Sequence, residues 1–386
     1  MTLETDLIHH PYRPPAGFES PQVATCKAST VIFADTAALR ARDWRSKAGY
    51  TYGLHGTPTT FTLEERIATL EGGRHALLVP SGLAAISLVN LALLQHGDEV
   101  LLPANVYGPS RELARHELAR FGITHRVYDP MDAAALATMI GPKTRLVWLE
   151  AAGSVTMEFP DLTGLVAAAK GHGVLTAIDN TWGAGIAFNA FALGIDVVMQ
   201  ALTKYPSGGG DVLMGSVATL DDALHERLKL THMRLGLGVG ANDAELVLRS
   251  LSSVVLRYHA HDAAARALAM FLSQRPEIAR VLHPALAGSP GHAHWQAGCS
   301  AAAGLFSVIF DARYSQVQVD RFVNALRCFR IGYSWAGPMS LVVPYDLQAL
   351  RPGTAEHGAL VRFSIGLEAV GDLQADLEQA LAALDG

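Results

Sequence analysis

The sequence lacks several features that mark specialised classes of protein. Only three cysteines occur in 386 residues, at Cys26, Cys299 and Cys328, and none of them forms a CxxC pair. Their odd number and wide spacing argue against a disulfide scaffold and favour free thiols in a reducing cytoplasm. The net charge is −6 and no polybasic block is present. Nucleic acid and anionic membranes are therefore not expected as partners.

Long uninterrupted apolar runs are also missing. The one stretch of membrane-spanning length, residues 76–94, is interrupted by Pro80-Ser81-Gly82 and carries Asn90 in its second half. We predict a buried strand, a tight turn and a helix there, and no membrane span. The N-terminus has neither the basic nor the apolar region of a signal peptide, so we expect a cytoplasmic protein.

Half of the residues are hydrophobic, which is enough for more than one core. Strand-like and helix-like patterns alternate from residue 58 to 250, and this predicts an α/β domain whose mostly parallel sheet is covered on both faces. Residues 251–386 predict a smaller α/β domain, and residues 1–57 an irregular arm that contacts a neighbouring subunit. Locally, we expect Thr62 to cap a helix with Glu65, and one long helix to begin near Asn242.

Two polar residues end apolar strand patterns in the first of these domains. Asp179 ends GVLTAID and Lys204 ends VVMQALTK, with one crossover between them. Open α/β sheets bind ligands beyond the carboxyl ends of parallel strands, so the two side chains are expected in one crevice. Lys204 suits a Schiff base with pyridoxal phosphate (PLP), and Asp179 suits its ring nitrogen. A helix cap at Asp179 and an exposed strand-end lysine are the ordinary alternatives.

Three further positions fit the same cofactor and an amino acid substrate. Ser81-Gly82 opens an apolar helix, where backbone N–H groups bind phosphate, although most Ser-Gly turns are ordinary N-caps and the signal alone is weak. Tyr107 follows a strand end and can stack on a ring, or can be a plain loop tyrosine. Arg362 lies within a strand of the smaller domain, where it suits a substrate carboxylate or a sheet surface.

Two other patterns are rejected as sites. Gly236, Gly238 and Gly240 have GxGxG spacing and follow no strand, so they do not predict dinucleotide binding. The HxH pairs at residues 259–261 and 292–294 have no nearby cysteine or carboxylate set, and we expect no metal site.

Together the motifs resemble the Cys/Met-metabolism family of PLP enzymes, from about Tyr50 to the C-terminus. The resemblance implies the fold of the PLP-dependent aminotransferases (fold type I), a three-layer sandwich. The strings that carry it are YGLHGTPTTF, LEGGRHALLVPSGLAA, NVYGPS, GSVTMEF, AIDNTWGAG, QALTKYPSGGGD, HPALAGSPGH, GYSWAGPMSL and VRFSIGLE.

The resemblance implies a role for each site residue. Lys204 and Tyr107 would be catalytic, with Tyr107 also stacked on the ring that Asp179 holds. The phosphate would be bound by Ser81, Gly82, Leu83 and Thr203, and by Tyr52 of a neighbouring subunit. The substrate would be bound by Arg362, Ser334, Trp335 and Ser154.

Several positions depart from the family pattern. Leu54 stands where an arginine usually binds phosphate, and His55 or another cation is a candidate replacement. Ala201 stands where γ-type relatives often carry a phosphate-binding serine. Ala151-Ala152 stands in place of a Ser-Pro pair, and Pro338-Met339 stands in place of a Tyr-Glu pair. These changes bear on cofactor affinity and on the choice of substrate.

The resemblance implies a carbon–sulfur lyase that converts an amino acid thioether, L-cystathionine, into homocysteine, pyruvate and ammonia by α,β-elimination. Ser154 and the Tyr-Ser-Trp run at 333–335 favour this branch. A γ-type synthase or sulfhydrylase is the alternative, and a non-catalytic PLP-binding regulator is a more distant one. Relatives are tetramers built from dimers, so a homotetramer is expected.

Overall fold

The computed structural model describes residues 5, 16–17, 19–351 and 358–384. Its larger sheet has seven strands in the order β1-β7-β6-β5-β4-β2-β3. β7 pairs antiparallel with both β1 and β6, and the other neighbours are parallel, so the expected mostly parallel α/β sheet is confirmed. The strands are β1 (His75–Val79), β2 (Glu99–Pro103), β3 (Thr124–Tyr128), β4 (Thr144–Glu150), β5 (Leu175–Asp179), β6 (Val197–Gln200) and β7 (Gly215–Thr219).

Helices cover both faces of this sheet. Alternate residues of β1 show the two faces, since Leu77 and Val79 belong to one apolar cluster and Ala76 and Leu78 to another. Helices α4 and α8 pack on the first face, and α3, α7 and α9 on the second. The helices are α2 (Thr36–Arg40), α3 (Pro58–Glu71), α4 (Gly82–Leu93), α5 (Gly108–Glu112), α6 (Ala133–Met139), α7 (Leu162–Gly171), α8 (Asp222–Leu235), α9 (Ala241–Leu251), α10 (Val254–Ser273), α11 (His292–Gly298), α12 (Gln316–Ala325), α13 (Leu347–Leu350) and α14 (Val370–Leu381).

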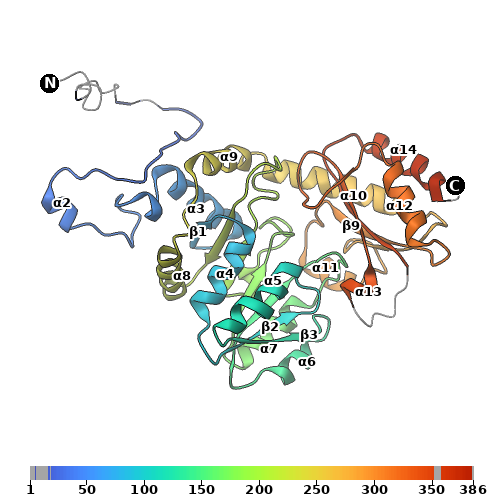
Figure 1. Ribbon diagram of the computed structural model, residues 1–386, viewed down its shortest axis with the longest axis horizontal. Coiled ribbons are helices and arrows are strands. Elements are labelled where there is room, and N and C mark those ends of the chain that lie inside the picture. The colour runs from blue at the N-terminus through green and yellow to red at the C-terminus, as the bar shows by residue number, and fades with distance from the viewer. Residues whose placement is uncertain (1–4, 6–15, 18, 352–357, 385–386) are drawn as a thin grey trace.

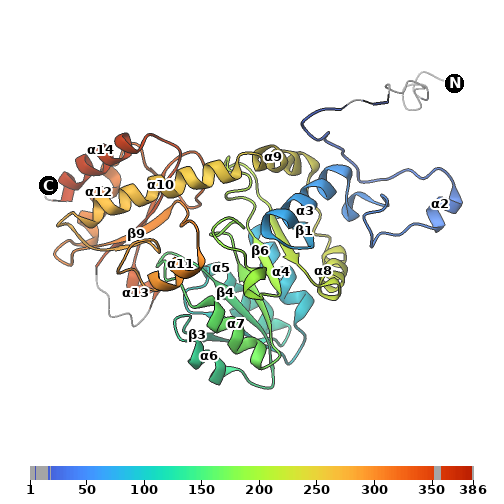
Figure 2. The same ribbon diagram turned by 180° about the vertical axis from the view of Figure 1, so that it is seen from behind.

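A second sheet of five strands has the order β10-β11-β12-β9-β8. Helix α10 leads into it from α9, and α10, α12 and α14 cover it with Leu268, Phe322 and Leu377 (Figures 1 and 2). Its strands are β8 (Ile278–Leu282), β9 (Leu305–Phe310), β10 (Arg330–Ile331), β11 (Leu341–Tyr345) and β12 (Leu360–Ser364). The domain boundaries proposed from the sequence stay a prediction.

Two local predictions are wrong. Helix α3 is capped by Thr57 and not by Thr62. Thr57 directly precedes Pro58, and its side chain forms a reciprocal capping box with Thr60. The long helix is two helices, α9 and α10. The hydroxyls of Ser252 and Ser253 donate to backbone carbonyls three residues back, and such bonds compete with a continuing helix.

The described part of the N-terminal arm projects from the body and carries the short helix α2 (Figure 1). Ile32 there is 92% exposed, an unusual state for so large an apolar side chain. Over the predicted membrane-length stretch the structure has β1, a turn and α4, as expected. Within the described residues, no helix is long and apolar enough to span a bilayer.

Candidate active site

The ends of three neighbouring strands deliver polar side chains to one edge of the larger sheet. Asp179 is the last residue of β5, and its register partner on β4 is Glu150. Lys204 lies in the turn that follows β6, where its N–H donates to the carbonyl of Ala201. Parallel strands place their carboxyl ends at the same edge of a sheet. The structure therefore has Asp179 and Lys204 at one sheet edge, as the sequence predicted.

The amine of Lys204 is held by the segment between β10 and β11. Its Nζ donates to Ser334 Oγ at 2.7 Å and lies 5.4 Å from the centroid of the Trp335 ring. Ser334 has a φ of +84°, a left-handed conformation that costs energy in any residue but glycine. Burial, followed by the positive charge of Arg362, lowers the pKa of Lys204 to about 8, and Asp179 opposes this shift.

The reactivity of Lys204 is therefore expected to depend on pH near neutrality. A free lysine is protonated up to about pH 10.4, whereas a pKa of about 8 gives Lys204 a sizeable neutral fraction. The rate at which cofactor-free protein condenses with pyridoxal phosphate should rise from pH 7 and level off above the pKa. Stopped-flow absorbance measures this rate. A rate that keeps rising to pH 10 would contradict the lowered pKa.

Asp179 is held by the residues that follow it. Its Oδ1 accepts hydrogen bonds from the backbone N–H of Thr181 at 3.0 Å and from the Thr181 hydroxyl at 2.5 Å. Burial raises the pKa of Asp179, while the bonds from Thr181 and the charge of Lys204 lower it. The hydrogen bonds and the charge of Lys204 thus only partly offset the cost of burying the Asp179 carboxylate. A carboxylate in this state suits a protonated ring nitrogen as a partner.

Tyr107 lies within electrostatic range of Asp179 and Arg362. Burial raises the pKa of Tyr107, the charges of Asp179 and Glu150 add to this, and Arg362 opposes it. Tyr107 is 43% exposed as a residue, so it is accessible to a ligand. The Tyr107 N–H donates to Glu150 Oε2 at 2.8 Å. Sequence reasoning missed Glu150, although it ends the apolar strand RLVWLE just as Asp179 ends its own.

The N-terminus of α4 is next to the lysine turn. A Cβ on Gly82 would lie 2.7 Å from the Ala201 methyl group, so only glycine fits there. The Ser81 hydroxyl caps the helix through the N–H of Ala84, and Leu83 is 37% exposed. The Thr203 hydroxyl bonds both backbone groups of Met214. Phosphate binding by these residues stays a prediction, with free helix N–H groups as its main support.

Arg362 extends from β12 towards the same crevice. It is 9% exposed, and its Nη2 donates to the carbonyl of Ser334 at 3.3 Å. Its Nε is buried without a hydrogen-bond partner among the described residues. Burial lowers the pKa of this guanidinium, and the Tyr345, Tyr333 and Tyr107 phenols oppose the shift. Arg362 is thus a buried cation with an unused N–H donor, and it is linked to Lys204 through Ser334. Such a group suits an α-carboxylate.

Replacement of Arg362 by lysine keeps the charge and removes the planar fork. The loss of a charge-assisted bond is worth about 1.5–3 kcal/mol, so KM for an amino acid substrate should rise roughly 10- to 100-fold with a smaller change in kcat. Steady-state kinetics measures both constants. Arg330→Lys, an exposed residue of β10, is the matched control and should leave KM unchanged. An unchanged KM in Arg362→Lys would remove Arg362 from the site.

The roles of two further residues, Ser154 beside Glu150 and Tyr52 in the arm, stay predictions. Ser154 is fixed through its backbone, since its N–H donates to the Asn105 carbonyl and its carbonyl accepts from Arg351. Tyr52 is in the arm, 48% exposed, with its ring edge-on to His55 at 5.9 Å. Its predicted contact is with another subunit, and it stays a prediction.

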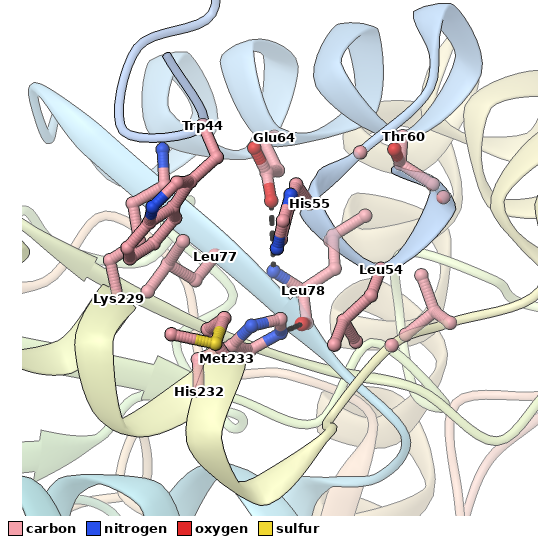
Figure 3. A pocket seen from close by; sticks show the side chains of 14 residues that line it. Trp44, Leu54, His55, Thr60, Glu64, Leu77, Leu78, Lys229, His232 and Met233 are labelled. Carbon is pink, nitrogen blue, oxygen red and sulfur yellow. Dashed lines mark hydrogen bonds between the residues drawn. The ribbon is translucent and has the colours of Figure 1, made fainter. Parts of the chain in front are cut away.

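Leu54 and His55 line a separate small cavity between the arm, α3, β1 and α8 (Figure 3). Its free volume of about 30 Å³ has room for a water molecule or two and not for a cofactor. Burial and the charges of Lys229 and His232 lower the pKa of His55, so its imidazole is neutral at pH 7. The proposed replacement of the family arginine by His55 stays a prediction.

The residues present fit pyridoxal phosphate. An amine of lowered pKa, a partly compensated carboxylate, a helix N-terminus packed against the lysine turn and an accessible aromatic ring converge on one edge of the sheet. Among the described residues, no group of three or more His, Cys, Asp or Glu side chains is arranged to hold a metal ion. Fold and site together define a PLP-dependent α/β enzyme.

Comparison with known proteins gives the family. The chain belongs to the Cys/Met metabolism PLP-dependent enzymes, whose sequence profile matches residues 4–382. It is 41% identical to the cystathionine beta-lyase of Bordetella avium over 98% of this chain and 96% of that protein. It is 35% identical to the cystathionine beta-lyase MetC of Escherichia coli, over 93% and 92%.

A solved structure extends the comparison to the fold. The cystathionine gamma synthase of Xanthomonas oryzae pv. oryzae, in complex with aminoacrylate and cysteine, superposes with a TM-score of 0.88 and 28% identity. The match covers 96% of this chain and 95% of that one. The recognised family, its fold and its cofactor are confirmed, while β-type and γ-type chemistry both occur among the similar proteins.

Proposed function

We propose that this protein is a cystathionine β-lyase, which cleaves L-cystathionine by α,β-elimination to homocysteine, pyruvate and ammonia. The observation that carries the proposal is the Lys204 amine bonded to Ser334, whose own carbonyl accepts from Arg362. An amine and a guanidinium linked through one residue match the α-carbon and α-carboxylate of an amino acid. Relatives that carry this name are 32–41% identical to the chain.

Each residue would have a defined task in this reaction. Bound pyridoxal phosphate supplies an aldehyde that condenses with amines and a ring that accepts electrons from the α-carbon. Arg362 binds the α-carboxylate and so orients the α-C–H bond towards Lys204. The neutral amine of Lys204 removes the α-proton, and Asp179 retains a proton at the ring nitrogen. General-base help of this kind is worth about 10²–10⁴-fold.

Elimination completes the sequence. The Cβ–S bond breaks, and the sulfur leaves as a thiolate that would take a proton from Lys204, the group that removed the α-proton. The three-carbon remainder is hydrolysed to pyruvate and ammonia, which consumes one water. Tyr107, which is close enough to Asp179 and Arg362 for their charges to affect its pKa, would assist the α-proton transfer.

The competing γ-type reaction has its own support in the likeness to a cystathionine gamma synthase. Product analysis separates the two. Incubation of purified, PLP-loaded protein with L-cystathionine should release pyruvate and homocysteine. Release of 2-oxobutyrate and cysteine would indicate cleavage at the γ-carbon, and dependence on an activated homoserine ester would indicate a synthase. Release of no product in any assay would favour a non-catalytic PLP-binding regulator.

The proposal also includes a cytoplasmic homotetramer in which Tyr52 reaches the site of a neighbouring subunit. Its support is the projecting arm with exposed apolar side chains such as Ile32 (Figure 1). Light scattering with activity measured on dilution tests this, and a fully active monomer would contradict it.

A further inference from the structure

A buried carboxylic acid lies behind the candidate site and takes no part in the proposed chemistry. Glu71, at the end of α3, is 2% exposed. Its two oxygens accept from Asn180 Nδ2 at 2.8 Å and from Gln200 Nε2 at 2.5 Å. No ion-pair partner of Glu71 is found in the part of the chain that the structure describes. A carboxyl group buried without a cation is costly, so it calls for an explanation.

The two amides belong to the strands that carry the candidate catalytic pair. Asn180 directly follows Asp179 at the end of β5, and Gln200 is the last residue of β6, four residues before Lys204. The last ladder pair between the strands is Asp179 with Met199. Glu71 therefore joins the two strands one residue beyond the point where their paired register ends.

A second tie at the same level makes the arrangement specific. The Thr181 hydroxyl donates to Asp179 Oδ1 at 2.5 Å and accepts from the Ala201 N–H at 2.9 Å. Thr181 thus links the carboxylate of one strand end to the turn that leads to Lys204. Glu71 fixes the residues on either side of this link, and both ties resist a change in the spacing between Asp179 and Lys204.

We propose that Glu71 is a positioning residue, which sets the separation of Asp179 and Lys204 by clamping Asn180 and Gln200 to the end of α3. The inference rests on the assignment of these two residues to the cofactor and not on which thioether is cleaved. Burial, with a smaller contribution from the charge of Asp179, raises the pKa of Glu71 to about 8, although the hydrogen bonds from Asn180 and Gln200 oppose the shift. At neutral pH the Glu71 side chain is thus mostly an uncharged acid, and its hydrogen bonds rather than its charge join the ends of β5 and β6.

Equilibrium titration of cofactor-free protein with pyridoxal phosphate tests the clamp. Glu71→Leu removes both bonds and should weaken cofactor affinity roughly tenfold. Gln200→Leu removes one bond and should weaken it roughly severalfold. Glu71→Gln should bind within about threefold of the parent, because the Asn180 and Gln200 amides can turn to pair with its amide. Borohydride reduction followed by peptide mapping reports whether Lys204 is the residue joined to the cofactor.

Asp196 supplies the matched control. It ties the opposite ends of β5 and β6, accepting at 2.8 Å from both the N–H and the hydroxyl of Thr176. Asp196→Asn should lower thermal stability and leave cofactor affinity unchanged. If Glu71→Leu and Gln200→Leu bind the cofactor as tightly as the parent, or if Asp196→Asn weakens binding equally, the positioning role is overturned. If the parent protein itself is not labelled at Lys204, the site assignment fails instead.

Discussion

Replacement of Lys204 by alanine should abolish turnover, with a loss of at least about 10⁴-fold in kcat/KM. The side chain has two tasks, the covalent attachment of the cofactor and the transfer of the α-proton. No other amine is placed to take them over in the described structure, where Lys204 is the lysine bonded to Ser334 and facing Trp335. Pyruvate release from L-cystathionine and the visible absorbance of the purified protein measure the two losses.

The control for this variant is Lys143→Ala, a change to an exposed lysine at the start of the β4 strand region. It should keep both the activity and the colour. Full lyase activity in Lys204→Ala would remove this residue from the mechanism and, with it, the central assignment of the site. A colourless Lys143→Ala protein would show that the absorbance assay is not specific.

Asp179→Asn should separate stability from function. The neutral amide cannot hold a proton at the ring nitrogen, so kcat/KM should fall on the order of 10²-fold or more. Burial raises the pKa of Asp179, which means that the folded state disfavours its charge. The cofactor-free variant should therefore unfold at the same temperature as the parent, or a higher one, at pH 7.

The sign of this stability effect can be checked against pH. When the pKa of a group is higher in the folded than in the unfolded state, the protein loses stability as the pH rises above the unfolded pKa. Below the usual aspartate value of 3.8 Asp179 is protonated in both states, so the stability advantage of Asp179→Asn should shrink there. Scanning calorimetry at several pH values measures it. Asp161→Asn, at the cap of α7, is the control, because asparagine also accepts the Gly164 N–H. Full activity in Asp179→Asn would contradict the assigned role.

The larger sheet and the amine–carboxylate pair were predictable because local patterns encode both. Apolar runs that end in one polar residue, as at Asp179, mark a strand and its functional end together. Glu150 has the same signature and was available to the same rule. Helix ends were less predictable, since Thr57 and Thr62 are both good caps and Pro58 decides between them.

The other half of the site depends on contacts that local sequence does not encode. Lys204 and Ser334 are 130 positions apart, and their contact requires the left-handed backbone at Ser334. Glu71 likewise meets Gln200 across 129 positions. A glutamate before two glycines indicates a helix end and gives no sign of burial. Such pairings come from tertiary packing, which a single sequence constrains only weakly.

The bond between Lys204 and Ser334 joins the large sheet to the segment between two strands of the small one. A reaction of the Lys204 amine with the cofactor would break that bond, and this removes one contact between the two halves of the molecule. Other bonds across the same boundary, such as the one from the Ser307 hydroxyl to the Val155 carbonyl, do not involve the amine and would keep the halves joined in the cofactor-loaded protein.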